Sequence, residues 1–598
     1  MQEYTSPGEV AIDPSENLTG RLFQAAETKP DHPAVAHRVG DRFVEWSNRQ
    51  FVDEILAVAK GLMAKGVKAG DRVAIYSGTR IEWTVFDFAI WAAGAVTVPI
   101  YETSSAEQVE WIVSDSNTVA IVIENDELRT NFDEVKGNLP GCEHAFVIDG
   151  GAVEELKQAG AAVSDEDVRT RADAVVGSDL ATIVYTSGTT GRPKGCVITH
   201  GNFVWDCVQV EAAAAAFFQE GERTLLFLPL AHILARIIQA ASIRAGVTLA
   251  YSTGIPNLME ELQIFKPTFL LAVPRVFEKV FNGAQQKAHG EGKGKIFDRA
   301  AAIAEQYSRE TEAGKVSLGV KVQHAIFDKL VYSKLRDAIG GRVRYAVSGG
   351  AALGERLGHF FNGVGITILE GYGLTETTAG ATINRPDAFR IGTVGKPVPG
   401  ASVRIAEDGE ILLKGGHIFQ GYYNNDEATA EVLEADGWFH TGDIGQLDGE
   451  GYLRITGRKK EIIVTAGGKN VAPAVLEDRM RSHFLVSQSM VVGDDQPFIA
   501  ALVTIDPEAF ATWADNNGKT GKSVADLVDD EDLRAEVQKA VDDANKAVSK
   551  AESVRTFRIL PDDFEVGVEL SQKQSVKRHV VGEKYGHVID DIYAGAKR

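Results

Sequence analysis

The residues of this chain best suited to chemistry lie in the run Tyr-Thr-Ser-Gly-Thr-Thr-Gly-Arg-Pro-Lys-Gly at positions 185–195. The run follows the apolar residues 181–184, which are typical of a strand, and it combines three glycines, four hydroxyl residues and one lysine. Such a segment can wrap backbone N–H groups and hydroxyls around a polyphosphate. It is not a Walker A loop, because Pro193 precedes Lys194 and Gly195 stands where a serine or threonine would hold magnesium. The run therefore predicts nucleotide binding by a loop of another kind.

A second set of chemically active side chains follows the apolar residues that end at Leu369. Positions 370–378 read Glu-Gly-Tyr-Gly-Leu-Thr-Glu-Thr-Thr, which places an aromatic ring, hydroxyls and the Glu376 carboxylate at the carboxyl end of a predicted strand. Open parallel sheets bind their ligands at this edge. The run Ser-Gly-Gly-Ala-Ala-Leu at 348–353 also ends a predicted strand, and Asp443 does so within 438–445. Each segment alone could be an ordinary turn after a strand.

Taken together, these runs resemble the signatures of the adenylate-forming (ANL) superfamily, which includes acyl-CoA synthetases, luciferases and peptide-synthetase adenylation domains. The match at 185–195 is close over all eleven positions. Residues 98–105, a long helical excursion before 348 and residues 496–503 look like those of bacterial long-chain fatty acyl-CoA synthetases. The resemblance covers the chain from about residue 17 to about residue 593. It implies a ligase that converts a long-chain fatty acid with ATP and Mg²⁺ to acyl-AMP, and then forms the thioester with CoA.

The resemblance also implies which residues bind the nucleotide. Tyr372 would stack on adenine, Asp443 would accept hydrogen bonds from the ribose, and Lys194 would hold the β- and γ-phosphates. The glycines at 467 and 468 would line the path of the pantetheine arm after the C-terminal domain turns about Lys460. The full set for nucleotide and CoA is Thr186, Ser187, Gly188, Thr189, Thr190, Gly191, Lys194, Gly349, Gly350, Ala351, Glu370, Gly371, Tyr372, Gly373, Thr375, Asp443, Arg458, Lys460, Gly467 and Gly468.

Four residues would act in catalysis by the same resemblance. Thr186 and Glu376 would hold Mg²⁺, a hard cation that needs few protein ligands when phosphate oxygens are present. His232 lies in the apolar run 227–236. A lone histidine in such a run is usually a core residue, but in this family the matching histidine faces the acyl carbonyl and the thiol entrance. The fourth residue is a lysine near the C-terminus, expected here at Lys573.

The region of that lysine departs from the family pattern, Leu-Thr-Pro-x-x-Lys-x-Lys-Arg. Positions 570–578 read Leu-Ser-Gln-Lys-Gln-Ser-Val-Lys-Arg, so that Ser575 falls where the lysine belongs and Lys573 lies two residues earlier. Two residues of extended chain span roughly 7 Å. Either the loop bends so that Lys573 reaches the site, or Lys577 acts instead, or adenylation is impaired. We favour Lys573.

The elements that must position these residues alternate between β-rich and helical runs, which predicts an α/β fold with mainly parallel, stacked sheets. Residues 51–65 have the spacing of an amphipathic helix, and residues 276–341 read as an inserted helical excursion with a loop tip at 290–294. Short strands and Asp-Gly turns predict a compact β subdomain at about 401–456. We expect an N-terminal domain at 1–457 and a mobile α+β domain at 458–598.

The composition of the chain argues against several other classes of protein. The chain has 598 residues, 62 Lys and Arg against 84 Asp and Glu, and a formal charge of −22, which argues against nucleic-acid binding. Three scattered cysteines predict reduced thiols. There is no signal-peptide pattern and no run of roughly 18 apolar residues, so we expect a cytoplasmic protein that contacts membranes peripherally at most. Chain-length preference and oligomeric state are left open.

Two other functions compete with the synthetase. A fatty acyl-AMP ligase, which passes its adenylate to a carrier protein, would share every ATP signature but usually carries an extra insertion, and we recognise none. A non-catalytic acyl- or nucleotide-binding protein is suggested only by the altered lysine region. The intact Thr186, Lys194, Glu376, Asp443 and Arg458 argue against it.

Overall fold

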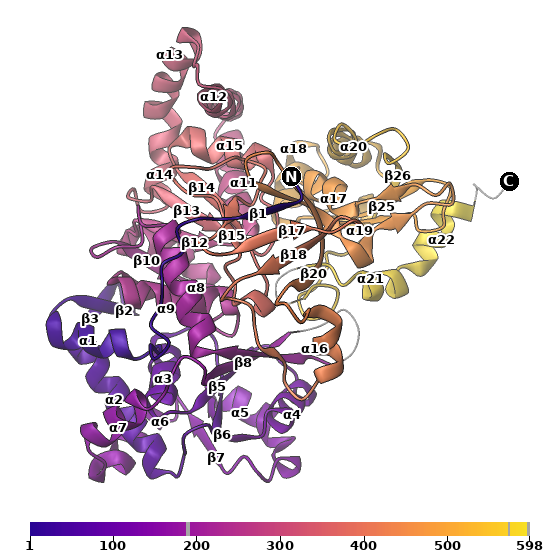
Figure 1. Cartoon of the computed structure of the whole chain (residues 1–598). Coiled ribbons are helices and arrows are strands. Elements are labelled where there is room, and N and C mark those ends of the chain that lie inside the picture. The colour runs from indigo at the N-terminus through magenta and orange to yellow at the C-terminus, as the bar shows by residue number, and fades with distance from the viewer. Residues whose placement is uncertain (187–191, 572–574, 595–598) are drawn as a thin grey trace.

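A computed structural model describes residues 1–186, 192–571 and 575–594 of the chain. It has a large N-terminal part built of several sheets and a small C-terminal α+β part, which confirms the predicted α/β class (Figure 1). Within the described residues, no helix has both the length and the apolar character needed to cross a bilayer. All three cysteines are buried, and none of them forms a disulfide.

The largest sheet has seven strands in the order β19-β9-β8-β5-β4-β6-β7. Its parallel centre includes β8, which confirms the strand predicted at 181–184. Helix α2 (Asn48–Ala64), the predicted amphipathic helix, begins with a capping box between Ser47 and Gln50, and its apolar side packs beneath the fully buried α3 (Ile81–Ala92). The strands are β4 (Arg72–Tyr76), β5 (Val96–Ile100), β6 (Thr118–Ile123), β7 (His144–Val147), β8 (Leu180–Thr186), β9 (Lys194–Thr199) and β19 (Gly421–Tyr422).

Two further sheets share the same hydrophobic core. One runs β12-β13-β14-β15-β16 and the other β10-β11-β2-β3, and both have parallel centres with an antiparallel edge. Their strands are β12 (Phe269–Ala272), β13 (Tyr345–Ser348), β14 (Thr367–Tyr372), β15 (Thr382–Ile383), β16 (Lys396–Pro397), β10 (Arg223–Leu226), β11 (Thr248–Tyr251), β2 (Pro33–Val39) and β3 (Arg42–Ser47). The helices that accompany the three sheets are α1 (Gly20–Thr28), α4 (Ala106–Asp115), α5 (Asp126–Asp133), α6 (Ala152–Ala159), α7 (Asp165–Asp173), α8 (His200–Ala213), α9 (Ile233–Ala245), α10 (Leu258–Phe265) and α15 (Glu355–Val364).

A buried ion pair fixes α9 against the largest sheet. Arg236 on α9 contacts both carboxylate oxygens of Asp87 on α3, at 2.6 Å and 3.2 Å, and both side chains are fully buried. A third bond, from Arg236 Nη1 to Thr182 Oγ1 at 2.7 Å, reaches strand β8. Because removing either partner of a buried pair leaves an uncompensated charge, this contact holds α9 and β8 in one register.

The predicted helical excursion is present and projects from the body of the molecule (Figure 1). Helix α11 (Pro274–Gly290) ends and α12 (Gly294–Glu312) begins on either side of the predicted loop tip. Then come α13 (Leu318–Phe327), the π-helical segment η4 (Asp328–Tyr332) and α14 (Ser333–Ala338). His324 of α13 stacks on Tyr307 of α12, with ring centroids 3.8 Å apart, which anchors one face of α13.

The β subdomain is an antiparallel sheet with the order β1-β17-β18-β20-β21. Three of its strands lie inside the predicted range: β17 (Ser402–Ile405), β18 (Glu410–Lys414) and β20 (Phe439–Leu447). A fourth, β21 (Leu453–Arg458), begins inside it and ends beyond it. The sequence missed its edge strand, β1 (Glu3–Thr5), which comes from the other end of the chain and pairs with β17. Helix α16 (Asp426–Val432) precedes β20.

The C-terminal part has a hydrophobic core of its own, built from residues between Ile463 and Ile559. Its sheet runs β24-β25-β26, where β25 pairs antiparallel with β24 and parallel with β26. The elements are β22 (Ile463–Val464), β23 (Asn470–Val471), α17 (Pro473–Arg481), β24 (Val486–Val492), β25 (Ile499–Ile505), α18 (Pro507–Asn516), α19 (Val524–Leu527), α20 (Glu531–Asn545), β26 (Val554–Ile559), α21 (Arg578–Lys584) and α22 (Gly586–Ala594). Two contacts join the N-terminal part to the C-terminal part. Arg275 donates to Asp506 at 3.0 Å, and Arg356 donates to the Ser482 carbonyl at 2.8 Å. The domain boundary at 457/458 stays a prediction.

Candidate active site

One cavity of about 2440 Å³ lies between the N-terminal sheets and the C-terminal part. It is larger than the several hundred Å³ typical of a pocket for one small molecule, so it has room for a nucleotide and a second substrate. The predicted residues that line it are Thr186, His232, Gly349, Gly350, Ala351, Glu370, Gly371, Tyr372, Gly373, Thr375, Glu376, Asp443, Arg458 and Lys460. Segments predicted from separate parts of the sequence therefore meet at one place.

The glycine-rich run connects the two strands of a hairpin. Strands β8 and β9 are antiparallel, and Thr186 and Lys194 are the last register partners before the connection. A side chain at Gly195 would lie 2.6 Å from Ile183 Cγ2, so only glycine lets the strands pack this closely. On the far side, Trp111 Nε1 donates to the Pro193 carbonyl at 2.9 Å, and the Arg192 guanidinium lies 4.7 Å from the Trp111 ring centroid. Ser187, Gly188, Thr189, Thr190 and Gly191 lie outside the described residues.

The loop after β14 is held in a tight turn. Thr378 and Ala379 have φ of +51° and +94°, a region that favours glycine, so the turn is strained. Two contacts hold it: Thr378 Oγ1 donates to the His417 carbonyl at 2.7 Å, and the Gly380 N–H donates to the buried Asp206 carboxylate at 3.0 Å. Gly373 is required, because a Cβ there would lie 1.7 Å from the Ala379 carbonyl oxygen. The turn presents Thr375 and Glu376 to the cavity.

A tyrosine that sequence reasoning missed links Glu376 to the lysine of the glycine-rich run. Tyr422 Oη donates to Glu376 Oε1 at 2.9 Å, and Lys194 Nζ lies 5.0 Å from the centroid of the Tyr422 ring. Tyr422 belongs to the two-residue strand β19, which pairs with β9 at Cys196. The sequence offers only the pair Tyr422-Tyr423 after a glycine as a sign of this residue. That pair does not indicate a contact with Glu376, which lies far away in the sequence.

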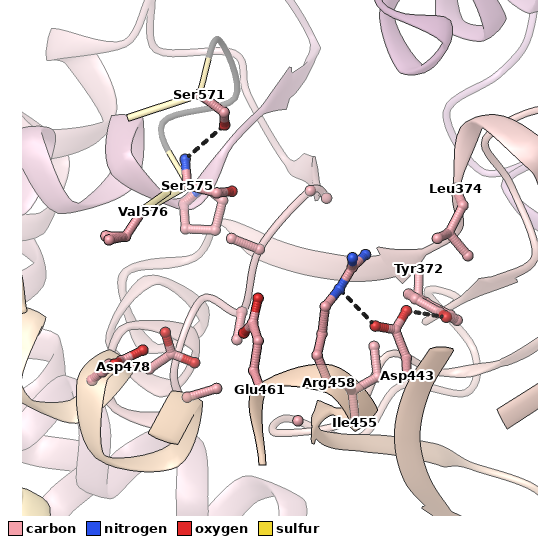
Figure 2. A pocket seen from close by; sticks show the side chains of 18 of the residues that line it. Tyr372, Leu374, Asp443, Ile455, Arg458, Glu461, Asp478, Ser571, Ser575 and Val576 are labelled. Atoms are coloured by element: carbon pink, nitrogen blue, oxygen red, sulfur yellow. Dashed lines mark hydrogen bonds and ion pairs between the residues drawn. The ribbon is translucent and has the colours of Figure 1, made fainter. Parts of the chain in front are cut away.

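Asp443 forms the centre of a second polar cluster (Figure 2). Tyr372 Oη donates to Asp443 Oδ2 at 2.6 Å, and Arg458 Nε lies 3.0 Å from Asp443 Oδ1. Asp443 on β20 and Arg458 on β21 are register partners in the β subdomain. Burial raises the pKa of Asp443 above its usual value, and the Arg458 charge opposes that shift. A paired carboxylate beside an aromatic ring is suited to a ribose and a base, which combine hydroxyl donors with a planar face.

The wall beside Tyr372 is made by the segments at 349–353 and 370. Gly349 lies against Leu234, whose Cδ2 is 3.3 Å from the position of an added Cβ, so the backbone approaches α9 closely. The Leu353 N–H donates to Glu370 Oε2 at 3.0 Å. Burial raises the pKa of Glu370 to about 7. This carboxyl group therefore titrates near neutrality inside the cavity.

His232 stands at the N-terminus of α9 and lines the cavity. Its Nδ1 accepts a hydrogen bond from the Leu234 N–H at 3.1 Å, so a neutral ring carries its proton on Nε2. The Arg236 contact with Asp87 and Thr182 holds the same helix against β8, the strand that leads into the glycine-rich run. His232 and that run are therefore positioned by one buried contact.

The C-terminal lysine region reaches the same cavity. Ser571 and Ser575 line it (Figure 2), and two hydrogen bonds join them: the Ser571 N–H donates to the Ser575 carbonyl at 2.8 Å, and Ser571 Oγ accepts from the Ser575 N–H at 3.2 Å. Lys573, between them, lies outside the described residues. Lys577 also lines the cavity, with its Nζ donating to the Gly567 carbonyl at 2.7 Å. The alternative lysine is therefore already engaged.

Three predicted residues that the structure describes do not line the cavity: Lys194, Gly467 and Gly468. Lys194 lies over Tyr422, as described above. The two glycines form the turn between β22 and β23, where the Gly468 N–H donates to the Thr465 carbonyl at 2.7 Å. In this arrangement of the domains they are not part of the site.

The donors near Glu376 fit magnesium. In the described part of the chain no three His, Cys, Asp or Glu side chains gather as a metal cage. Glu376 and Thr186 are hard oxygen donors that line one cavity. Mg²⁺ usually takes one or two protein carboxylates and completes its shell with water and phosphate oxygens, so this set is sufficient when a nucleotide supplies the rest.

Known proteins are similar to this chain in fold and in sequence. The hairpin, the stacked sheets and the separate C-terminal unit define the adenylation-domain class of fold: the adenylation domain of carboxylic acid reductase from Segniliparus rugosus superposes with a TM-score of 0.75 at 22% identity, over 97% of this chain and 94% of that one. The model of AMP-binding enzymes matches residues 22–423, and that of the AMP-binding enzyme C-terminal domain matches 460–597. The chain belongs to the AMP-binding enzyme family.

Curated relatives are similar over the whole length. The long-chain-fatty-acid–CoA ligase FadD15 of Mycobacterium tuberculosis is 50% identical over 598 residues, covering 99% of this chain and 100% of its own. The long-chain-fatty-acid–CoA ligase ACSBG2 of Xenopus laevis is 31% identical and covers 96% of this chain and 84% of its own length.

Proposed function

We propose that this protein is a long-chain-fatty-acid–CoA ligase, which uses ATP and Mg²⁺ to form acyl-AMP and then acyl-CoA. The observation that carries the proposal is the meeting of Thr186, Glu376, Asp443, Ser571 and Ser575 in one cavity. Those groups match the phosphate, metal, ribose and carboxylate of an adenylation reaction. The identity of 50% over the full length to a ligase of this name supports the same substrate class.

In the first half-reaction, a carboxylate oxygen of the fatty acid attacks the α-phosphorus of ATP. A new P–O bond forms, the bond to the bridging oxygen breaks, and pyrophosphate leaves. Asp443, Tyr372 and Arg458 bind the ribose and base, so that the α-phosphate lies near the loop of Thr375. Bound Mg²⁺ would neutralise phosphate charge, held by Glu376 and Thr186. Positioning of this kind lowers the barrier by removing the need to bring two anions together in water.

Lys573 is the cation that we assign to this step. The two described residues that flank it, Ser571 and Ser575, both line the cavity and are hydrogen-bonded to each other. An ammonium group there would pair with the attacking carboxylate and the α-phosphate oxygens. For this reason we favour Lys573 over Lys577 as the acting lysine.

In the second half-reaction, the CoA sulfur attacks the acyl carbonyl, the mixed anhydride bond breaks, and AMP leaves. The thiol proton passes to solvent, and His232, which lines the cavity and accepts a hydrogen bond from the Leu234 N–H, would orient the acyl carbonyl. The glycines at 467 and 468 would enter the site only after the C-terminal domain turns about Lys460. The contacts Arg275–Asp506 and Arg356–Ser482 would then have to break.

Pyrophosphate release from Mg·ATP and palmitate, with and without CoA, tests the function. We expect sustained release and palmitoyl-CoA only when CoA is present, and about one equivalent of pyrophosphate without it. Release that CoA does not accelerate would favour transfer to a carrier protein. If no release occurs in any condition, the protein is not this ligase. Glu376→Gln serves as the inactive control.

A further inference from the structure

Helix α13 carries an apolar face that no described part of the chain covers. Leu318, Val322, Ile326 and Leu330 recur every four residues along α13 and η4, and they are exposed to 81%, 57%, 51% and 54%. Residues four apart lie on the same side of a helix, so these four form one stripe. Scattered exposed apolar residues need no explanation, but an ordered stripe of large ones indicates an interaction surface.

The opposite face of α13 packs against the rest of the excursion. Val320 is buried, His324 stacks on Tyr307 and also contacts the Gly363 carbonyl at 2.6 Å, and Gln323 accepts a bond of 2.7 Å from Arg299. The helix is therefore held in place by its inner side. Its outer stripe is presented rigidly, at the end of the excursion that projects from the molecule (Figure 1).

Positive charge surrounds this stripe in a protein that is otherwise acidic. Residues 313–336 contain one acid, Asp328, which pairs with Arg336 at 2.8 Å. The chain as a whole has a formal charge of −22. The exposed lysines of the segment are Lys315, Lys321, Lys329 and Lys334. Within the described residues, the first three of these lysines form no ion pair with a carboxylate. An apolar stripe with lysines beside it matches the boundary of an anionic bilayer, where phosphates lie above acyl chains.

We propose that α13 and η4 dock this protein on the surface of an anionic lipid bilayer, with Leu318, Val322, Ile326 and Leu330 inserted at the level of the acyl chains. A second copy of the chain fits less well, because a helix of ten residues is about 15 Å long and a stable protein interface needs 20 to 30 residues a side. The four positive charges would also face each other in a symmetric pair.

The docking surface is linked to the cavity through helix α12. Helix α12, which packs against α13, contributes Arg309 to the cavity lining, and α11 contributes Arg275 and Glu278. The excursion thus connects the bilayer with the site. If the proposed function holds, the docked enzyme would meet fatty acids where they partition, but the docking itself does not depend on that function.

Co-sedimentation of the full chain with lipid vesicles tests the proposal. Vesicles of phosphatidylcholine with phosphatidylglycerol should bind the protein, vesicles of phosphatidylcholine alone should bind it weakly, and salt should weaken the binding. Val322→Ser/Ile326→Ser should lower the binding constant about tenfold or more. Lys315→Gln/Lys321→Gln/Lys329→Gln should lower it by roughly fivefold for each lysine removed.

The matched control is Val39→Ser/Ile255→Ser, which removes the same two residue types at 49% and 51% exposure from other surfaces. It should bind vesicles as the unaltered protein does. Equal binding by the α13 variant and this control would overturn the proposal, as would failure of the unaltered protein to bind. Sedimentation of the protein without lipid tests whether a second copy of the chain binds the stripe instead. That would be the case if the protein is a dimer, the Val322→Ser/Ile326→Ser variant is a monomer, and neither binds vesicles. The Tm of all three variants should equal that of the unaltered protein, which checks that they are folded.

Discussion

Tyr372 and Arg458 each occupy one oxygen of the Asp443 carboxylate, at 2.6 Å and 3.0 Å. The carboxylate is thus fixed in position by two donors from different strands, β14 and β21. A ribose that binds here meets an acceptor whose orientation is already set, and this reduces the entropy lost on binding.

Asp443→Ala should therefore weaken the use of ATP strongly. It removes a charged acceptor and leaves Arg458 without its partner, so kcat/KM for ATP should fall about 100-fold, consistent with roughly 3 kcal/mol for lost charged hydrogen bonds. Tyr372→Phe deletes only one donor and should cost about tenfold or less. Steady-state pyrophosphate release at varied ATP measures both. Equal effects of the two changes would mean that Asp443 does not contact the nucleotide.

Tyr422→Phe should change the dependence on magnesium. The phenol donates to Glu376 at 2.9 Å, and its loss leaves the carboxylate less well oriented. The Mg²⁺ concentration for half-maximal activity should rise several-fold, with kcat nearly restored at saturating Mg²⁺. Tyr423→Phe, in the adjacent position, is the control. A fall in kcat that excess Mg²⁺ does not relieve would assign Tyr422 another role.

Lys573→Ala should abolish the first half-reaction and spare the second. Pyrophosphate release should fall by 100-fold or more, while thioester formation from added acyl-AMP and CoA should remain within a few-fold, because only the first step needs the extra cation. Lys577→Ala, whose Nζ is bound to the Gly567 carbonyl, should have a small effect on both steps. The reverse order of effects would identify Lys577 as the acting lysine.

The strands and motifs that could be predicted share one property: their signal is local. Apolar runs that end in glycine-rich segments marked β8, β13 and β14, and residues at or after the ends of these strands, such as Thr186, Gly349 and Glu376, line the cavity. Tyr422 and β1 were missed because strands of two and three residues show no periodicity and pair with partners far away in the chain. Arg236 was missed for a different reason. It stands in an apolar helix, and only the fold brings Asp87 and Thr182 to it.

Glu370 should make stability depend on pH. Burial raises its pKa from 4.5 to about 7, so the folded protein holds this proton more tightly than the unfolded chain does. Its contribution to stability is therefore lost as the pH rises from about 4.5 to about 7, with a full cost on the order of 3 kcal/mol.

Glu370→Gln keeps an acceptor for the Leu353 N–H but removes the titration. Its Tm relative to that of the unaltered protein should be higher at pH 8 than at pH 5. Glu166→Gln, at an exposed position on α7, should show no such difference. A Tm difference that is the same at both pH values would show that Glu370 is not buried as described.

Strand β1 is translated long before β17, the strand with which it pairs. Thr5 and Ser402, whose hydroxyls lie 2.8 Å apart in the β subdomain, are separated by 397 residues. At 5 to 20 residues per second, the ribosome needs roughly 20 to 80 s to make the distance between them. Strand β1 is thus the edge of a sheet whose other strands, at residues 402–458, are translated much later, and throughout that interval its backbone donors and acceptors must be satisfied by water or by a chaperone.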